Sequence, residues 1–216
     1  MQQDKSSPLE KWLQQTVQEV KEKTPNKLAI DISIFSIPNA LRTIAEQLDN
    51  WNKLQTLNVK LSKNEVYQPE VECLAKSLQK YHSVSNISLV FNCVSVDEDT
   101  MFMIGKAICS SQNTQSVNLV FRGCQIGSEG ISLIGKKVVG CHNLQSFSMG
   151  LMNNNINYEG AFVFISELSK LPRLNSFNLN LTANRNLRHD YLIKKMYKLS
   201  RVVKFVSVDR EPYFLN

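Results

Sequence analysis

Apolar and polar residues alternate in five short segments of the chain, which recur at a fixed interval of thirty positions. Such alternation is typical of a strand with one buried face, because successive side chains point to opposite sides. The five segments begin at Leu54, Val84, Thr114, Leu144 and Leu174. A sixth begins two positions early, at Val202, and a degenerate first copy carries Leu28, Ile30 and Ile32. We expect a strand at each of these places.

Between the strands the apolar spacing changes to that of a helix. Ile131, Ile134, Val138 and Cys141 are spaced three or four apart and therefore share one helical face. The same face recurs in other units, at Leu41, Ile44, Leu48 and Trp51, at Val71, Leu74, Leu78 and Tyr81, at Met101, Ile104, Ile108 and Ser111, at Ala161, Phe164, Leu168 and Leu171, and at Leu192, Met196 and Leu199. Each unit is predicted to be strand, turn, helix and turn. Such units bury their apolar sides by stacking, and right-handed crossovers make their strands parallel.

The unit resembles a leucine-rich repeat of the long, helix-containing ribonuclease-inhibitor type. The best copy spans 114–143, where Cys124, Ile126 and Gly130 match the Asn-or-Cys, the next apolar residue and the glycine of that pattern. Asn64, Asn154 and Asn184 take the place of Cys124, Gly160 that of Gly130, and Val94 departs from the pattern. The resemblance covers about residues 28–207. It implies an α/β solenoid, a horseshoe with parallel strands on the concave face and helices on the convex face.

Repeat arrays need end caps, and the N-terminal segment is a candidate for one. Ser7, Pro8 and Glu10 form a helix-start signature in which Ser7 and Glu10 complete a capping box. One apolar stripe follows, made of Leu9, Trp12, Leu13, Val17 and Val20. This stripe either closes the core or forms a free amphipathic arm for a partner or membrane. At the other end of the chain, residues 213–216 either cover the last strand or dock elsewhere. We expect an N-terminal tail and capping helix over 1–24, six repeats over 25–201, and a final strand and tail over 202–216.

Composition makes this an ordinary globular chain of 216 residues with 43% hydrophobic residues. Its apolar runs are too short to span a membrane, and the N-terminus has no apolar signal core, which predicts an intracellular protein. Five cysteines, an odd number without a C-x-x-C pair, are expected to be reduced and mostly buried: Cys73, Cys93, Cys109, Cys124 and Cys141.

Motifs of catalysis are missing from the sequence. There is no G-x-S-x-G, no phosphate-binding glycine loop, and no metal-ligand spacing among its three histidines and its cysteines. The acids of 97–99 are interpreted as a helix cap, through Asp97 or Asp99, more simply than as a cation site. We therefore predict no enzyme activity, no cofactor, no metal and no small-molecule substrate.

The polar side of the predicted strands would line the concave face. Its candidate contact residues are small and uncharged: Asn58, Ser88, Asn118, Ser148, Asn178 and Asn180. They lack the Trp, Tyr and Arg of protein hot spots and the Lys and Arg that contact phosphates. Such a face either accepts a close-packed neighbour or is solvated.

Charge is concentrated at the C-terminal end. Residues 170–216 hold ten Lys and Arg against three Asp and Glu, whereas 1–169 carry a net charge of −1. The candidate patch consists of Arg185, Arg188, Lys194, Lys195, Lys198 and Arg201. It forms either a solvated helix or a docking surface for an acidic protein segment, with RNA less favoured because few aromatic residues are interleaved.

Together these features predict a non-catalytic protein–protein interaction module, a small scaffold or accessory subunit of a larger intracellular assembly. The cytoplasm is the expected compartment, with the cytoskeleton as one candidate location and no membrane attachment. The alternative is a nucleic-acid-binding protein that uses the basic C-terminal end. A salt titration distinguishes the two hypotheses, because the affinity for nucleic-acid phosphates falls steeply as the salt concentration rises.

Overall fold

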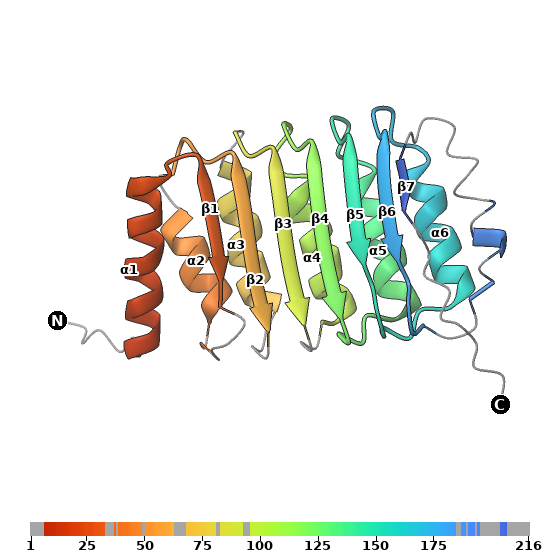
Figure 1. Ribbon diagram of the computed structural model, residues 1–216, viewed down its shortest axis with the longest axis horizontal. Coiled ribbons are helices and arrows are strands. Elements are labelled where there is room, and N and C mark those ends of the chain that lie inside the picture. Colours follow the sequence, from red (N-terminus) through yellow and green to blue (C-terminus); the bar gives the residue numbers. More distant parts are fainter. Residues whose placement is uncertain are drawn as a thin grey trace.

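Helices and strands alternate along the chain and form two layers, strands on one side and helices on the other (Figure 1). The computed structural model describes residues 7–32, 37, 39–48, 51–62, 68–80, 83–92, 96–184, 187–188, 190–192, 194 and 204–206. In chain order the elements are α1 (Pro8–Lys23), β1 (Lys27–Asp31), α2 (Ala40–Leu48), β2 (Thr56–Ser62), α3 (Gln68–Lys80), β3 (Asn86–Asn92), α4 (Glu98–Ile108), β4 (Ser116–Arg122), α5 (Gly127–Val138), β5 (Ser146–Gly150), α6 (Tyr158–Leu168), β6 (Ser176–Asn180) and β7 (Lys204–Val206).

The seven strands form one parallel sheet in the order in which they occur in the chain. From β2 to β6, partners in the register lie thirty positions apart, as Asn58 and Ser88 do. The first pairing is one position shorter, with Lys27 opposite Thr56, and the last is two shorter, with Ser176 opposite Lys204. The fold is the predicted α/β leucine-rich-repeat solenoid, including its shortened last unit.

A continuous core lies between the sheet and the helices. Leu57, Val59 and Leu61 of β2 are at most 1% exposed, as the alternation predicted. The helical faces inferred from period 3.6 are buried wherever their residues are described, from Leu41 in α2 to Leu192 near the C-terminus. Tyr81, Met196 and Leu199 of those faces lie outside the described residues. The stacked rings of Phe91 and Phe121, 5.3 Å apart between centroids, show how equivalent positions of neighbouring units meet.

At the starts of α1 and α4, a side chain accepts a hydrogen bond from a backbone N–H group that has no partner within the helix. Ser7 accepts from the N–H of Glu10, whose carboxylate accepts from the N–H of Ser7, so the predicted capping box is present. Asp97 accepts from the N–H of Thr100 at 2.8 Å, which identifies it as the cap of α4. These short polar residues fix where α1 and α4 begin.

Between strands and helices, a buried asparagine connects neighbouring units. Asn154 is 0% exposed; its Nδ2 donates to Phe121 O at 2.6 Å and its Oδ1 accepts from Cys124 N at 2.9 Å. Asn184 repeats the arrangement one unit later, donating to Leu151 O and accepting from Asn154 N. These bonds satisfy backbone groups that bend away from the sheet, where no strand partner is available. Asn64 and Val94, at the equivalent positions, lie outside the described residues.

Helix α1 covers the N-terminal end of the array (Figure 1) and packs against α2 and β1. Leu13 and Val17 are fully buried, and Val20 is partly buried against the core. Leu9 and Trp12 are 41% and 40% exposed, so the predicted five-residue stripe contributes only three side chains to the core. The packing supports the cap over the free arm.

Deleting residues 1–23 is expected to expose the apolar side of the first unit and to cause aggregation, because α1 is the element that covers it. Size-exclusion chromatography and a thermal melt measure the effect. The matched control is the pair Leu9→Ser and Trp12→Ser, which changes only the exposed part of the stripe and should leave a monomer. A monomeric truncated chain with an unchanged Tm would contradict the capping role of α1.

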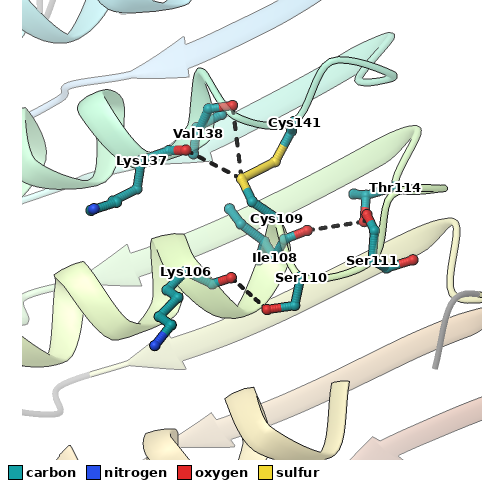
Figure 2. The surroundings of a disulfide bond; sticks show 9 residues. All are labelled: Lys106, Ile108, Cys109, Ser110, Ser111, Thr114, Lys137, Val138 and Cys141. Carbon is teal, nitrogen blue, oxygen red and sulfur yellow. Dashed lines mark hydrogen bonds between the residues drawn. A yellow bond between two sulfur atoms is a disulfide. The ribbon is translucent and has the colours of Figure 1, made fainter. Parts of the chain in front are cut away.

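Two cysteines differ from the expectation that all five are reduced. Cys109 and Cys141 form a disulfide with a Cα–Cα distance of 5.0 Å (Figure 2). They are 32 positions apart in the sequence. They meet because Cys109, the C-terminal cap residue of α4, lies against the turn that follows α5. Cys73 and Cys124 are free, and Cys124 is buried as expected. Cys93 lies outside the described residues.

Candidate functional site

The strand side that faces away from the helices is named here the open face (Figure 1). It consists of the non-core positions of β1–β6, where burial alternates between core and partly exposed side chains. In the register these positions form three rows across the sheet. From β2 to β6 the rows are Thr56, Asn86, Ser116, Ser146 and Ser176; Asn58, Ser88, Asn118, Ser148 and Asn178; and Lys60, Val90, Val120, Gly150 and Asn180. The structure thus brings all six predicted concave-face residues onto one surface.

Much of the hydrogen-bonding capacity of the open face is unused. Neighbouring strands lie about 4.8 Å apart, so small side chains in one row reach each other only in some pairs. Asn118 Nδ2 donates to Ser88 Oγ at 2.9 Å in the second row. Within the described part of the chain, the hydroxyls of Ser116, Ser146 and Ser176 make no hydrogen bond to the protein. An incoming polar group could therefore bond to them without breaking a bond inside the protein.

A short apolar strip interrupts the polar surface in the third row. Val90 and Val120 are partly exposed on adjacent strands, and Gly150 follows on the next. A Cβ atom placed on Gly150 would lie 3.4 Å from Val120 Cγ1, so this glycine leaves the flank of the valine uncovered. The sequence-based prediction named only polar residues here. The period of thirty could have revealed the strip, because the three residues occupy equivalent positions.

A hollow of about 320 Å³ lies at the N-terminal end of the open face. Its side chains come from three adjacent strands and comprise Ala29, Asp31, Asn58, Lys60, Ser88 and Val90. Lys60 Nζ lies 2.9 Å from Asp31 Oδ2, with the two side chains about half exposed. An ion pair this exposed contributes little to stability. The hollow therefore joins the end of the apolar strip to a pair of charges that remain accessible to a partner.

The basic C-terminal patch is described only in part. Arg188 and Lys194 are exposed, whereas Arg185, Lys195, Lys198 and Arg201 lie outside the described residues, as do residues 213–216. Arg188 lies over the ring of Tyr158 at 5.7 Å, and Lys194 over that of Tyr191 at 5.8 Å. Tyr191 is 61% exposed. Aromatic rings thus accompany both described cations of the patch.

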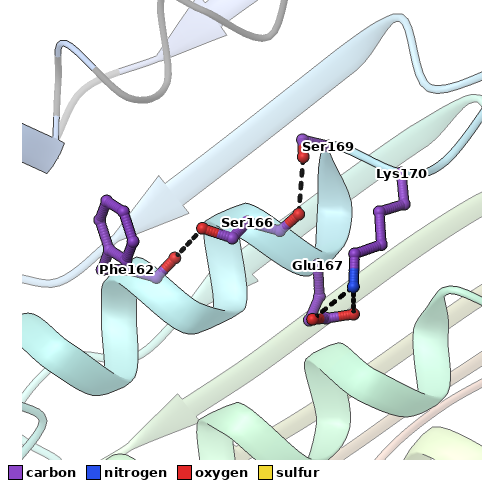
Figure 3. Close-up of polar contacts among 5 residues, drawn as sticks. All are labelled: Phe162, Ser166, Glu167, Ser169 and Lys170. Carbon is purple, nitrogen blue, oxygen red and sulfur yellow. Dashed lines mark hydrogen bonds and ion pairs between the residues drawn. The ribbon is translucent and has the colours of Figure 1, made fainter.

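Other basic residues near this end are engaged with neighbouring polar groups. Lys170 Nζ lies within 2.7 Å of both carboxylate oxygens of Glu167 at the end of α6 (Figure 3). Arg173 donates to Asn143 Oδ1 at 2.7 Å. The charge of Lys170, which was counted toward the C-terminal excess, is therefore compensated locally by Glu167.

Among the described residues, no group of three or more His, Cys, Asp or Glu side chains is placed to hold a metal ion. In the same part of the chain, the helices fall short of the length and apolar character needed to cross a membrane.

No protein-family model and no curated protein matches this sequence. Among solved structures the chain is similar to one titled "Leiomodin-1 Actin-Binding Site 2 (ABS2)", at 11% sequence identity. The match covers 87% of each chain with a TM-score of 0.49. The strand register and the repeated core positions of the chain itself identify the solenoid.

Proposed function

We propose that this chain is a non-catalytic protein–protein interaction module that docks through the open face. The observation that carries the proposal is a parallel sheet with one side covered by helices and the other covered by no described element. Parallel sheets are usually covered on both faces. Here the second face carries small polar side chains, which permit exposure to water and also close approach by a partner.

Three properties of the open face support docking over simple solvation. Its serine hydroxyls have hydrogen-bonding capacity that the described protein groups leave unused. Its short side chains lose little rotamer entropy when they are covered. The strip of Val90, Val120 and Gly150 adds apolar area at the centre of the sheet, which a partner would bury with a gain in free energy.

The finer features of the proposal follow from the repeat pattern. The units are proposed to be of the ribonuclease-inhibitor type, because Cys124, Asn154 and Asn184 occupy equivalent positions and the connecting elements are full helices. As a compact array, the chain is proposed to act as a small scaffold or accessory subunit of a larger intracellular assembly in the cytoplasm, with the cytoskeleton as one candidate location. Immunolocalisation of the full chain tests the proposed location.

Asn118→Arg combined with Ser148→Arg is expected to abolish association with the native assembly. Two long charged side chains in the middle of the second row would hold a partner away and leave buried charges unpaired. Co-purification from the native source measures association, and circular dichroism with a thermal melt confirms the fold.

The matched control, Gln112→Arg with His142→Arg, adds the same charge at exposed positions in the turns outside the open face. It should associate like the wild type. A third variant, Arg188→Glu with Lys194→Glu, tests the described part of the basic patch. Loss of association in this variant alone would move the docking surface to the C-terminal end, and a salt titration would then separate an acidic protein from nucleic acid.

A further inference from the structure

The disulfide joins two neighbouring repeat units at the edge where the helices end and the next strands begin (Figure 2). Cys109 is the C-terminal cap residue of α4, and Cys141 lies in the turn between α5 and β5. Their Cα atoms are 5.0 Å apart, inside the range that a disulfide requires. The stacking of the units alone brings the two residues together, since the bond links different units of the array.

The surroundings of Cys109 also accommodate the reduced form. The sulfur of Cys109 lies 3.3 Å from the carbonyl oxygen of Lys137 and 3.8 Å from that of Val138. A disulfide sulfur has no hydrogen to donate, but a thiol at this place would have two carbonyl acceptors within reach. The Cys109 thiol would therefore have hydrogen-bond acceptors at the end of α5.

Equivalent positions elsewhere in the array support the same conclusion. Ser111, thirty positions before Cys141, donates its hydroxyl to Val84 O at 2.7 Å. Ser169, sixty positions after Cys109, donates to Ser166 O at 2.6 Å (Figure 3). The fold thus places a small hydrogen-bond donor at each of these positions in another unit. Neither position requires a covalent bond for the fold.

Exposure differs between the three cysteine residues Cys109, Cys124 and Cys141. Cys109 is partly exposed, Cys141 is 5% exposed, and the free Cys124 is 0% exposed. Thiol–disulfide exchange begins with attack by a thiolate on an accessible sulfur. Cys109 is therefore the point of entry for reduction, whereas Cys124 is shielded from the same reagent.

We propose that Cys109 and Cys141 form a reversible redox pair that locks two neighbouring repeats together. Oxidation consumes one molecule of a low-molecular-weight disulfide such as oxidised glutathione. The Cys109 thiolate attacks it and releases one glutathione thiol, and Cys141 then attacks the mixed disulfide and releases the second. Two protein thiols become one disulfide, and two glutathione thiols are formed. Reduction runs through the same intermediate in reverse.

The disulfide links the C-terminal end of α4 to the turn that leads into β5. Cys141 O accepts from Leu144 N at 2.9 Å in the turn that leads into the strand, and Gln145 N donates to Gln115 O at 2.8 Å. In the oxidised form, α4 is covalently tied to this turn. Reduction leaves the hydrogen bonds but releases the tie, so the C-terminal end of α5 and the start of β5 should open more often.

Equilibration of the full-length protein in a series of reduced and oxidised glutathione mixtures tests the proposal. The samples are quenched by alkylation, and mass spectrometry measures the fraction of chains linked through Cys109 and Cys141. One reversible transition within the series is expected, with Cys124 remaining a thiol throughout. The oxidised form should melt roughly 4–16 °C higher than the reduced form, the range for one disulfide in a chain of this size, and amide exchange should slow at the start of β5.

Cys109→Ser combined with Cys141→Ser is the matched variant, because serine already occupies the equivalent positions at 169 and 111. Its Tm should equal that of the reduced protein and should not change along the glutathione series. Absence of the link in the most oxidising mixture would overturn the proposal, and so would a link that survives excess reduced glutathione. Glutathione retained on Cys109 without closure to Cys141 would overturn it as well. These readouts are independent of partner binding.

Discussion

Ile134→Asp is expected to unfold the repeat array. Ile134 is 0% exposed in α5, and its Cγ1 lies against the backbone of α4, 3.4 Å from where a Cβ on Gly105 would stand. Aspartate would lose the apolar burial, worth about 1.5–3 kcal/mol, and would place an unpaired charge in the core. The combined loss should exceed about 4–5 kcal/mol, which is comparable to the whole stability of many domains. Urea denaturation and a thermal melt measure it.

Two controls separate this effect from a general intolerance of α5 to substitution. Ile134→Val keeps an apolar side chain and should cost about 0.5–1.5 kcal/mol. Lys136→Ala, two positions along the same helix, changes an exposed side chain and should stay within about 0.5 kcal/mol. If Ile134→Asp melted like the wild type, the assignment of this helical face to the core would be wrong.

The second large effect is expected from Asn154→Ala. The substitution removes two donated bonds, to Phe121 O and Met152 O, and two accepted bonds, from Cys124 N and Ile126 N. A buried backbone group left without its partner costs about 1–3 kcal/mol. Since water can reach some of the released groups after relaxation, we expect a total loss of about 3–5 kcal/mol in the free energy of unfolding, measured by urea denaturation.

Asn157→Ala is the matched control, since Asn157 is exposed and caps α6 through Gly160 N. Loss of this cap should cost about 1 kcal/mol. Asn154→Cys should fall between the two, because the Cys124 thiol, a single weak donor, lies 3.5 Å from each of two carbonyl oxygens at the same place in the preceding unit. Equal destabilisation by Asn154→Ala and Asn157→Ala would mean that the buried asparagine does not connect the units.

The fold was well predicted from the sequence because two patterns agree: the alternation of apolar and polar residues within a strand, and the interval of thirty positions between strands. The alternation from Leu57 to Leu61 indicates which face of a strand is buried, and the interval of thirty repeats that face in the next strand. The cap was predicted less well. Helix α1 has 16 residues and α2 has 9, so α1 is longer by roughly 10 Å. Its first turns, with Leu9 and Trp12, therefore have less of the array to cover.

The candidate surfaces were harder to predict, because their properties arise between units. Cys109 and Cys141 do not share a repeat position, so the period of thirty gives no reason to pair them; the path of the turn after α5 does. The charge count at the C-terminal end could not show that Lys170 is already paired with Glu167. The second row of the open face was predicted residue by residue, since register alone defines it, but its hydrogen-bonding capacity depends on the side-chain contacts.

Site-specific photo-crosslinking tests most directly whether the open face is the docking surface. A photoreactive amino acid at Asn118, in the centre of the second row, is compared with the same amino acid at Gln112, an exposed position in the turn before β4. Both proteins are incubated with the native assembly and irradiated, and the products are identified by mass spectrometry. The proposed function predicts a discrete crosslinked partner from position 118, lost when Ser148→Arg is added, and none from position 112. Crosslinks from position 112 alone, or equal products from both positions, would contradict it.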